Sequence, residues 1–340
     1  MASSTPAPSF VTRTPIALVL LALGWLLPTT ARADKLSGVV RVYVQKPGSS
    51  EVEPEAEVQV KLKTKRRART RAVILVEGHY YARDLYVKDA YLDHAALPGV
   101  RLRLGIDKKV LGLEYEEPSR MRLTLHRSYV YQALETLGLV GRQLELRLLT
   151  HPVSTSSGLY ADLGLGMDGS RNQNVLGSLR TRVGPFGWGA WGLVERHRIE
   201  HTYIPVWAAV TSVWLDSGAI RVATELFSGI DAASTEFERT HGDGHPVAFY
   251  GPRGEIALRL PLTERWRLEP FVQGSLLARD ALEPAKGHKA QVLGGLNLRS
   301  KRLVFRTNAE LAVDQGGAAD NLSTSVQRRA LYHASAALSF

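Results

Sequence analysis

The sequence has 340 residues, a formal net charge of +10 and no cysteine. A chain without cysteine forms neither disulfides nor thiolate metal sites, which excludes the small disulfide-rich scaffolds of secreted proteins. The basic excess fits nucleic acid, anionic lipid or anionic solutes as partners, so the placement of the charges has to distinguish among these three.

The first 33 residues have the features of a secretory signal peptide. Arg13 supplies a positive charge, Ile16 to Leu27 form an uncharged apolar run, and Ala31-Arg32-Ala33 matches a small-x-small cleavage site. The apolar run is shorter than the about 20 residues that a membrane-spanning helix needs. We therefore predict that the signal peptide is cleaved and that residues 34–340 form one exported domain, which argues against nucleic acid as a partner.

Sixteen segments after the predicted signal peptide have the character of β-strands. Most of them alternate apolar with polar side chains, and a period of two is the side-chain period of a strand. In the fifteenth segment, for example, Leu303, Phe305 and Leu311 alternate with Arg306 and Glu310. The predicted strands are about 36–46, 56–66, 69–78, 83–94, 99–108, 142–150, 158–168, 175–183, 188–197, 205–216, 218–228, 249–262, 265–279, 288–299, 301–314 and 330–340.

The lengths and connections of these strands favour a membrane barrel. Many of them exceed the about 5–6 residues usual in soluble sheets and suit the about 9–11 residues of a tilted membrane-crossing strand. Some connections are short, such as 300–301, and others are long and polar, such as 228–248 and 314–329. Bacterial barrels combine short periplasmic turns with longer extracellular loops. We predict an all-β fold, a transmembrane antiparallel β-barrel of about 16 strands; the alternative is a soluble secreted β-protein.

The last strand carries a candidate insertion signal. Tyr332, Leu338 and Phe340 fall on one apolar face, and the chain ends in the aromatic Phe340. A terminal aromatic on such a strand resembles the signal by which outer-membrane barrels are recognised by the barrel assembly machinery. The alternative is an ordinary edge strand of a soluble sheet.

A series of short motifs in a fixed order resembles the phosphate-selective (polyphosphate-selective) porin family. A strand with Asp89-Ala90-Tyr91 leads into a second strand that ends in Gly105 and Lys108. Arg127-Ser128 and Gly141-Arg142-Gln143 then match the family's Arg-Ser pair and the opening of its next strand. Gly295-Leu296-Asn297 is similar to a strand near the family's end.

This resemblance implies a 16-stranded outer-membrane barrel, usually trimeric, with one loop folded inward to narrow the pore. The clear part of the likeness covers residues 88–143. Two positions depart from the family pattern. Lys109-Val110-Leu111 stands where the family has Pro-Phe, and His126 stands where it has an acidic residue.

The segment 109–141 is the candidate constriction loop of the pore. Guanidinium and ammonium groups in a narrow passage of low dielectric attract anions and repel cations. Glu114, Glu116, Glu117 and Glu135 are in the same segment, so the alternative is that ion pairs hold the loop against the wall. The anion-attracting candidates are Lys108, Lys109, Arg120, Arg122, His126 and Arg127.

A second group of arginines falls on the predicted lumen faces of the strands. With acids such as Glu145 and Glu310 on the same faces, these arginines could cross-link the wall without selecting ions, although the basic excess mildly favours anions. The arginines are Arg101, Arg103, Arg147, Arg180, Arg182, Arg221, Arg259, Arg267, Arg299, Arg302 and Arg306.

These patterns predict a porin of the Gram-negative outer membrane that lets small hydrophilic solutes diffuse passively, with a mild preference for phosphate-like anions. A pore needs no catalytic group, cofactor or metal, so we expect none and no enzyme activity. His241 and His245 around Asp243 have metal-ligand spacing but fit a solvated loop. Membrane lipid and a homotrimer are the expected partners. The alternative is a plugged or narrow barrel that acts as a scaffold, an adhesin or a membrane enzyme.

Overall fold

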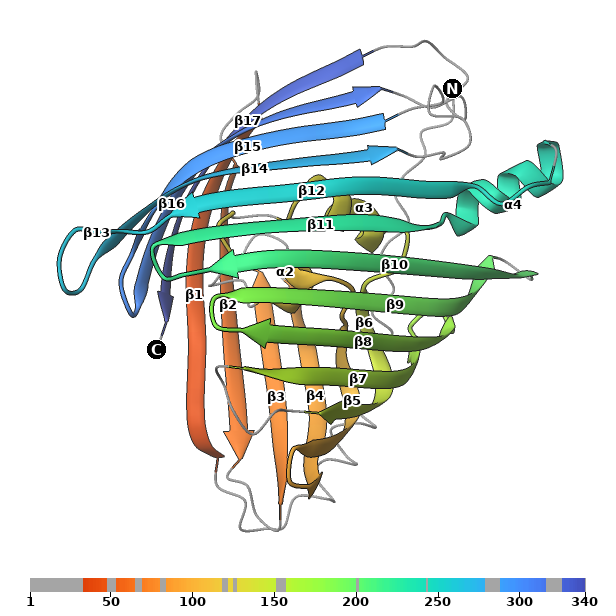
Figure 1. Ribbon diagram of the computed structural model, residues 1–340, viewed down its shortest axis with the longest axis horizontal. Helices are drawn as coiled ribbons and strands as arrows, with labels where there is room; N and C mark the ends of the chain where they lie inside the picture. Colours follow the sequence, from red (N-terminus) through yellow and green to blue (C-terminus); the bar gives the residue numbers. More distant parts are fainter. Residues whose placement is uncertain are drawn as a thin grey trace.

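The chain folds into a closed antiparallel β-barrel (Figure 1). The computed structural model describes residues 33–47, 53–64, 69–79, 84–117, 122–124, 127–150, 157–199, 202–242, 244–278, 288–315 and 326–339. The strands are β1 (Ala33–Pro47), β2 (Glu53–Thr64), β3 (Thr70–His79), β4 (Asp84–Leu97), β5 (Val100–Lys109), β6 (Gly141–Thr150), β7 (Ser157–Asp168), β8 (Gln173–Val183), β9 (Phe186–Ile199), β10 (Thr202–Asp216), β11 (Ile220–Ile230), β12 (Ala248–Leu258), β13 (Leu260–Pro261), β14 (Arg267–Ala278), β15 (His288–Arg299), β16 (Leu303–Gln315) and β17 (Val326–Ser339).

Sixteen strands form the barrel wall. The labels run to β17 because β13 continues β12 after an interruption at Arg259, and both pair with β14. The last strand pairs with the first, for example Val40 opposite Leu338, so the sheet has no free edge. Closure satisfies the backbone hydrogen bonds that a lipid environment cannot. The predicted fold class and strand number are therefore confirmed.

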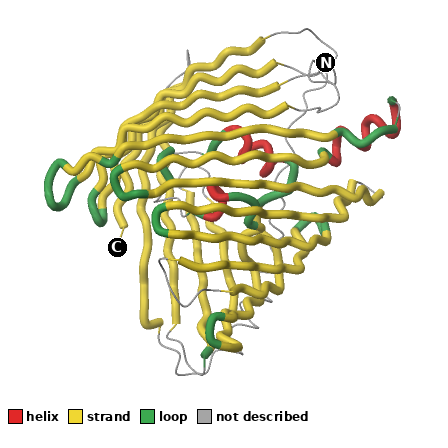
Figure 2. The backbone as a smooth tube through the Cα atoms, in the orientation of Figure 1, coloured by secondary structure: helices red, strands yellow, loops and turns green. Residues whose placement is uncertain are grey.

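One connection that the sequence shows only as a long polar loop contains a helix. Helix α4 (Ala232–His241) follows β11, and the carboxylate of its N-cap Asp231 accepts hydrogen bonds from the backbone N–H groups of Ala233 and Ser234. Figure 2 shows α4 beyond the end of the barrel, away from the other helices. No described helix is both long enough and apolar enough to cross a bilayer.

The outer face of the barrel is an apolar belt. On β6 and β7, for example, Leu146, Leu148, Leu163 and Leu165 are 40–55% exposed, although leucine is normally buried in a soluble protein. Most alternate residues on the same strands, such as Glu145 and Arg147, are buried on the inner side and are polar or small. An outward apolar face around a closed barrel is the arrangement that faces lipid, and it confirms the predicted outer-membrane location.

The two ends of the barrel differ. One end, here called the turn end, carries the short connections 184–185, 217–219, 262–266 and 300–302, and β1 starts there beside the end of β17. The opposite end, here called the loop end, carries α4 (Figure 1). This asymmetry agrees with short periplasmic turns and longer loops outside.

Candidate pore constriction

Between β5 and β6 the chain leaves the loop end and folds into the barrel. This part, here called the inner segment, comprises residues 110–117, 122–124 and 127–140 and contains α2 (Leu113–Glu116) and α3 (Tyr129–Thr136). Both helices lie within the outline of the barrel (Figures 1 and 2). The inward turn begins at Gly112, whose φ is +89° and whose added Cβ would lie 2.0 Å from the Tyr131 hydroxyl. Only glycine fits this turn without strain.

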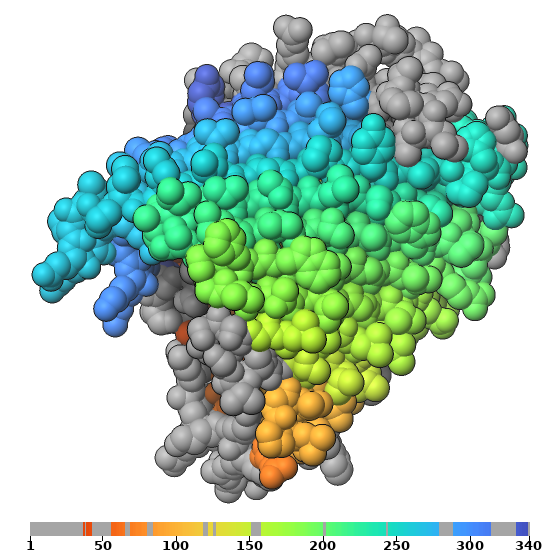
Figure 3. Space-filling view, in the orientation of Figure 1, coloured from red at the N-terminus to blue at the C-terminus, as the bar shows by residue number. Residues whose placement is uncertain are grey.

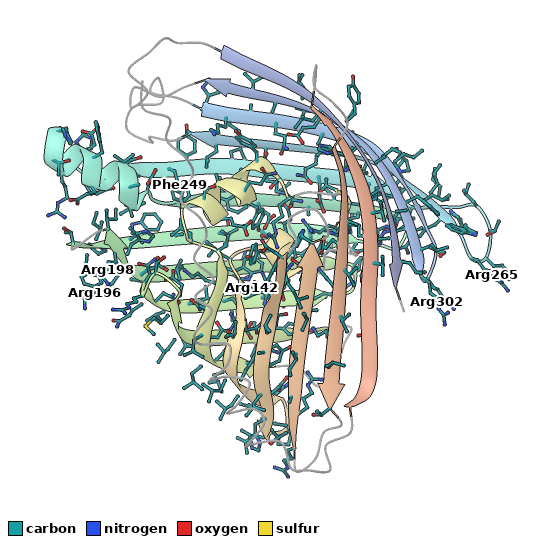
Figure 4. The ribbon with its side chains drawn as sticks, turned by 180° about the vertical axis from the view of Figure 1, so that it is seen from behind. Arg142, Arg196, Arg198, Phe249, Arg265 and Arg302 are labelled. Carbon is teal, nitrogen blue, oxygen red and sulfur yellow. The ribbon has the colours of Figure 1, made fainter. Side chains whose placement is uncertain are left out.

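The inner segment packs against an apolar part of the inner wall. Tyr131 stacks edge-on against Phe227 of β11, with ring centroids 5.1 Å apart. Burial of each such side chain contributes about 1.5–3 kcal/mol, so these contacts fix the segment on the wall. The fully or nearly fully buried members of this cluster are Leu111, Tyr115, Val130, Tyr131, Leu134, Leu139 and Val140 from the segment, Leu176, Trp191, Leu193, Ile204, Val206, Ala208, Val210, Phe227, Phe249 and Leu277 from the strands, and Ala232 from α4. Phe249 is labelled in Figure 4.

A buried ionic network reinforces this packing. The guanidinium of Arg253 on β12 lies 2.8 Å from Glu114 of the segment and 2.8 Å from Glu225 of β11. Glu225 also accepts hydrogen bonds from the Leu113 N–H at 2.7 Å and from the Tyr131 hydroxyl at 2.8 Å. Burial and the charge of Glu225 raise the pKa of Tyr131, which keeps its hydroxyl a donor.

The other acid of the network, Glu114, fixes the start of α3. Its carboxylate accepts hydrogen bonds from the N–H of Ser128 at 2.8 Å and from its hydroxyl at 2.7 Å. One arginine and two carboxylates thus tie both helices of the inner segment to β11 and β12. The expectation that ion pairs hold the loop against the wall is correct for these residues.

Lys109, predicted at the constriction, is instead buried behind the inner segment. Its ammonium donates to Glu195 of β9 at 2.6 Å and to the carbonyl of Gly138 at 2.7 Å, and the residue is only 1% exposed. It therefore holds the C-terminal end of α3 and is not accessible to solutes. Lys108, the next residue back along β5, is half-buried and lies 6.0 Å above the Tyr115 ring.

Arg122 is buried in the inner segment, and Arg127 is half-buried. The Arg127 guanidinium stacks 4.0 Å above the Tyr115 ring and pairs with Glu135 at 3.4 Å. Burial, and next the positive charge of Arg127, lower the pKa of Arg122 to about 10, so it still carries a charge at neutral pH. Arg120 and His126 lie outside the described residues.

Three strand arginines converge with Arg122 to form a group here called the basic cluster. Arg299 of β15 and Arg306 of β16 donate to the Arg122 carbonyl at 2.6 and 3.5 Å. Arg41 of β1 is close enough for its charge to act on Arg122 and Arg306. Two carboxylates balance part of this charge, because Arg41 pairs with Glu57 at 2.8 Å and Arg299 pairs with Glu269.

Most predicted lumen arginines lie on the inner wall and are paired. Arg147 contacts Glu145 at 3.0 Å, and Arg180 contacts Asp162 at 2.6 Å and also Glu116 of the inner segment. These pairs cross-link the wall, in agreement with the alternative that the lumen arginines brace the barrel.

The remaining predicted lumen arginines divide between the wall and the turns. Arg101 and Arg103 both lie against Asp93 of β4. Arg182 donates to the Gly184 carbonyl in a turn at 3.0 Å, and Arg302 lies exposed in the turn before β16, outside the strand predicted for it.

Two important arginines, Arg41 and Arg253, were not among the predicted site residues. Both fall on the inward phase of alternating strands, and this phase is a signal that the sequence contains. Among the described residues no group of three or more His, Asp or Glu side chains could hold a metal. Asp243 lies outside the described residues.

Comparisons of sequence find no matching family model and no curated relative. Comparison of structure finds porin barrels. An anion-selective porin from Comamonas acidovorans aligns with a TM-score of 0.60 at 11% sequence identity. The alignment covers 90% of this chain and 99% of the porin. The outer membrane channel DcaP of Acinetobacter baumannii has a TM-score of 0.60 at 9% identity, with 90% and 96% covered.

OmpT, an outer membrane protein of Vibrio cholerae in a trimer form, has a TM-score of 0.60 at 10% identity, with 90% and 98% covered. Identities this low show a shared fold and nothing finer. The chain therefore has the architecture of outer-membrane porins.

Proposed function

We propose that the chain is an outer-membrane porin through which small hydrophilic solutes diffuse passively, with a mild preference for phosphate-like anions. The observation that carries the proposal is the basic cluster, in which Arg122 of the inner segment faces Arg41, Arg299 and Arg306 of the wall. The fold supports the channel, because the structural neighbours include an anion-selective porin and an outer membrane channel.

The charge balance of the basic cluster explains why the preference is mild. A guanidinium at about 4 Å attracts an anion by about 4 kcal/mol at an effective dielectric constant near 20. Glu57 and Glu269 offset much of this attraction, since they pair with Arg41 and Arg299. The inner segment itself is tied to the same part of the wall, because Asn297 and Arg299 of β15 donate hydrogen bonds to the carbonyls of Leu123 and Arg122.

A channel of this kind works by geometry and field, so we assign it no enzyme activity and no cofactor. We further propose that Tyr332, Leu338 and Phe340 form the signal read by the barrel assembly machinery and that the chain forms homotrimers. Tyr332 and Leu338 are exposed on the outer face, where such a signal has to lie, and Phe340 lies outside the described residues. Residues 1–33 remain a predicted signal peptide.

A narrow or plugged barrel that acts as a scaffold, an adhesin or a membrane enzyme is the second candidate. The apolar packing of the inner segment, which fills one side of the lumen, favours it. Planar-bilayer recording of the purified chain separates the two candidates. Discrete, steady conductance steps support the porin, whereas a chain that inserts without conducting contradicts it.

A further inference from the structure

The outer face of β8, β9 and β10 is apolar up to a sharp limit near the loop end. Figure 3 looks onto this face of the barrel. Val194 of β9 lies opposite Val175 of β8 and Trp207 of β10, and all three side chains are exposed. An exposed apolar row that includes an aromatic side chain is typical of the boundary between lipid chains and headgroups. These three residues, here called the apolar row, therefore mark the outer limit of the hydrocarbon layer on this face.

Beyond the apolar row the outward positions become polar and basic. Arg196 is the next outward residue of β9 after Val194; it is exposed and lies opposite Gln173 of β8. Arg198 continues the same outward phase of β9 and lies opposite Tyr203 of β10. Figure 4 labels both arginines at this edge of the barrel. The outer surface thus changes from apolar to basic within one step of the strand period.

The turn between β7 and β8 adds a third arginine, Arg171, which is exposed. The carboxylate of Asp168 holds this turn, because it accepts hydrogen bonds from the N–H groups of Ser170 at 2.9 Å and Asn172 at 3.0 Å. The side-chain oxygen of Asn172 in turn accepts from the Arg198 N–H at 2.7 Å, which fixes the turn beside β9. The group here called the outer basic patch comprises Arg171, Gln173, Arg196, Arg198 and Tyr203.

Arg196 is available to a ligand that approaches from the membrane. Its guanidinium lies 4.9 Å from the centre of the Tyr203 ring, and it forms no ion pair with any carboxylate in the described parts of the chain. The adjacent acid, Glu195, is on the inner side, where Lys109 and His197 contact it at 2.6 and 2.8 Å. A cation over an aromatic ring keeps its outward side open to an anion.

We propose that the outer basic patch binds the phosphorylated headgroup of a glycolipid in the outer leaflet, with the acyl chains of that lipid against the apolar row. A guanidinium group matches phosphate geometry through two parallel hydrogen bonds, and basic side chains at a membrane surface attract anionic headgroups. The apolar row distinguishes a lipid from a soluble anion, because only a lipid contacts the row and the patch at once. This inference goes beyond the proposed function, since the patch faces away from the lumen and binding requires no open pore.

The first test measures the binding of purified lipopolysaccharide to the full-length chain in a nonionic detergent at low ionic strength, by microscale thermophoresis. The double variant Arg196→Gln/Arg198→Gln removes two charges from the patch. Its matched control, Lys301→Gln/Arg302→Gln, removes two charges from an exposed turn at the turn end. We expect about tenfold weaker binding in the patch variant, the effect of two cationic contacts at a membrane surface, and unchanged binding in the control.

A second measurement uses the wild-type chain alone, so it decides the matter even if the patch variant does not fold. Dephosphorylated lipopolysaccharide should bind about tenfold more weakly than the intact lipid, because the charged contacts are lost. Inorganic phosphate at the same concentration should not displace the intact lipid, because it makes no contact with the apolar row.

The proposal is wrong if intact lipopolysaccharide does not bind saturably, if the patch variant binds it as tightly as the wild type, or if the control loses as much affinity. It is also wrong if dephosphorylation has no effect. Displacement by inorganic phosphate would assign the patch to a soluble anion. Equally tight binding of phosphatidylglycerol would assign it to anionic lipids in general, and either result would overturn the assignment to an outer-leaflet glycolipid.

Discussion

Arg253 is the residue on which the position of the inner segment depends most. Its guanidinium lies between Glu114 and Glu225, and all three side chains are almost completely buried. Replacing it by methionine keeps much of the volume but leaves two carboxylates without their counter-ion. Loss of one partner of a buried ion pair costs about 3–5 kcal/mol. We expect Arg253→Met to lower the urea midpoint of the refolded barrel clearly, while Arg196→Met at an exposed position leaves it unchanged; equal midpoints would contradict the network.

We expect Glu117 of the inner segment to make ion selectivity sensitive to pH. Burial raises its pKa to about 7, although it pairs with Arg221 at 2.5 Å. Below pH 7 the carboxyl is neutral and the inner segment gains positive charge. The anion preference should therefore be stronger at pH 6 than at pH 8, and Glu117→Gln should remove the difference. Zero-current potentials at the two pH values test this; a pH effect that persists in the variant assigns it to another group.

Glu117 also makes the stability of the folded chain depend on pH. Its pKa in the folded chain lies above the usual 4.5, so the folded state binds the proton more tightly than the unfolded state. The contribution of Glu117 to stability is therefore fully present below about pH 4.5 and is lost as the pH rises to about 7. In Glu117→Gln this contribution to the pH dependence of the unfolding free energy should disappear.

At the scale of single residues the sequence predicts whether a strand side chain points inward or outward better than it predicts what that side chain does. The alternation in β5 and β6 placed Arg101, Arg103 and Arg147 on the inner wall. It could not show that Lys109 is covered, because the carboxylate that holds it, Glu195, is 86 positions away along the chain. Partners at such separations are set by barrel closure, which period-two patterns do not encode.

At the scale of elements the strands were predictable and the helices were not. A strand that faces lipid on one side and the lumen on the other shows its period directly. The residues of α3 that carry its packing, such as Val130 and Leu134, are apolar because they belong to the same buried cluster as Leu193 and Phe227 of the wall. That reason for their apolarity becomes visible only when the inner segment is seen inside the barrel.

The inward turn of the inner segment requires a glycine at position 112. Gly112→Ala would bring a Cβ to 2.0 Å from the Tyr131 hydroxyl and 3.0 Å from Glu225, at a φ of +89°. Gly184→Ala is the matched control, since its φ is +57° but nothing lies within 4 Å of its Cβ. Backbone strain alone costs about 1–3 kcal/mol, and both variants bear it. We expect a larger loss of stability and noisier channel openings in Gly112→Ala; equal effects would mean that the close approach to Tyr131 is unimportant.

At the scale of the whole molecule the inner segment is held by two unlike parts of the inner wall. On the β8–β12 side it packs through the apolar cluster and the Arg253 network. The β15–β1 side brings the basic cluster together from three strands and the segment. The three wall arginines of this cluster are almost completely buried, so we expect their charge to act on solutes through the electrostatic field in the lumen and not by direct contact.

Ion selectivity tests the role of the basic cluster most directly. Arg41→Gln/Arg122→Gln removes two charges from the basic cluster, and Arg196→Gln/Arg198→Gln removes two from the loop end. Partial compensation by Glu57 limits the change, so the anion-to-cation permeability ratio should fall by about twofold, as for a partly screened pair worth about 0.4 kcal/mol. Raising the salt concentration should shrink the difference between variant and wild type, because screening acts on the same charges. Zero-current potentials in a salt gradient measure both effects. If the wild-type chain already prefers cations, or if the two double variants behave alike, the basic cluster braces the inner segment and does not select ions.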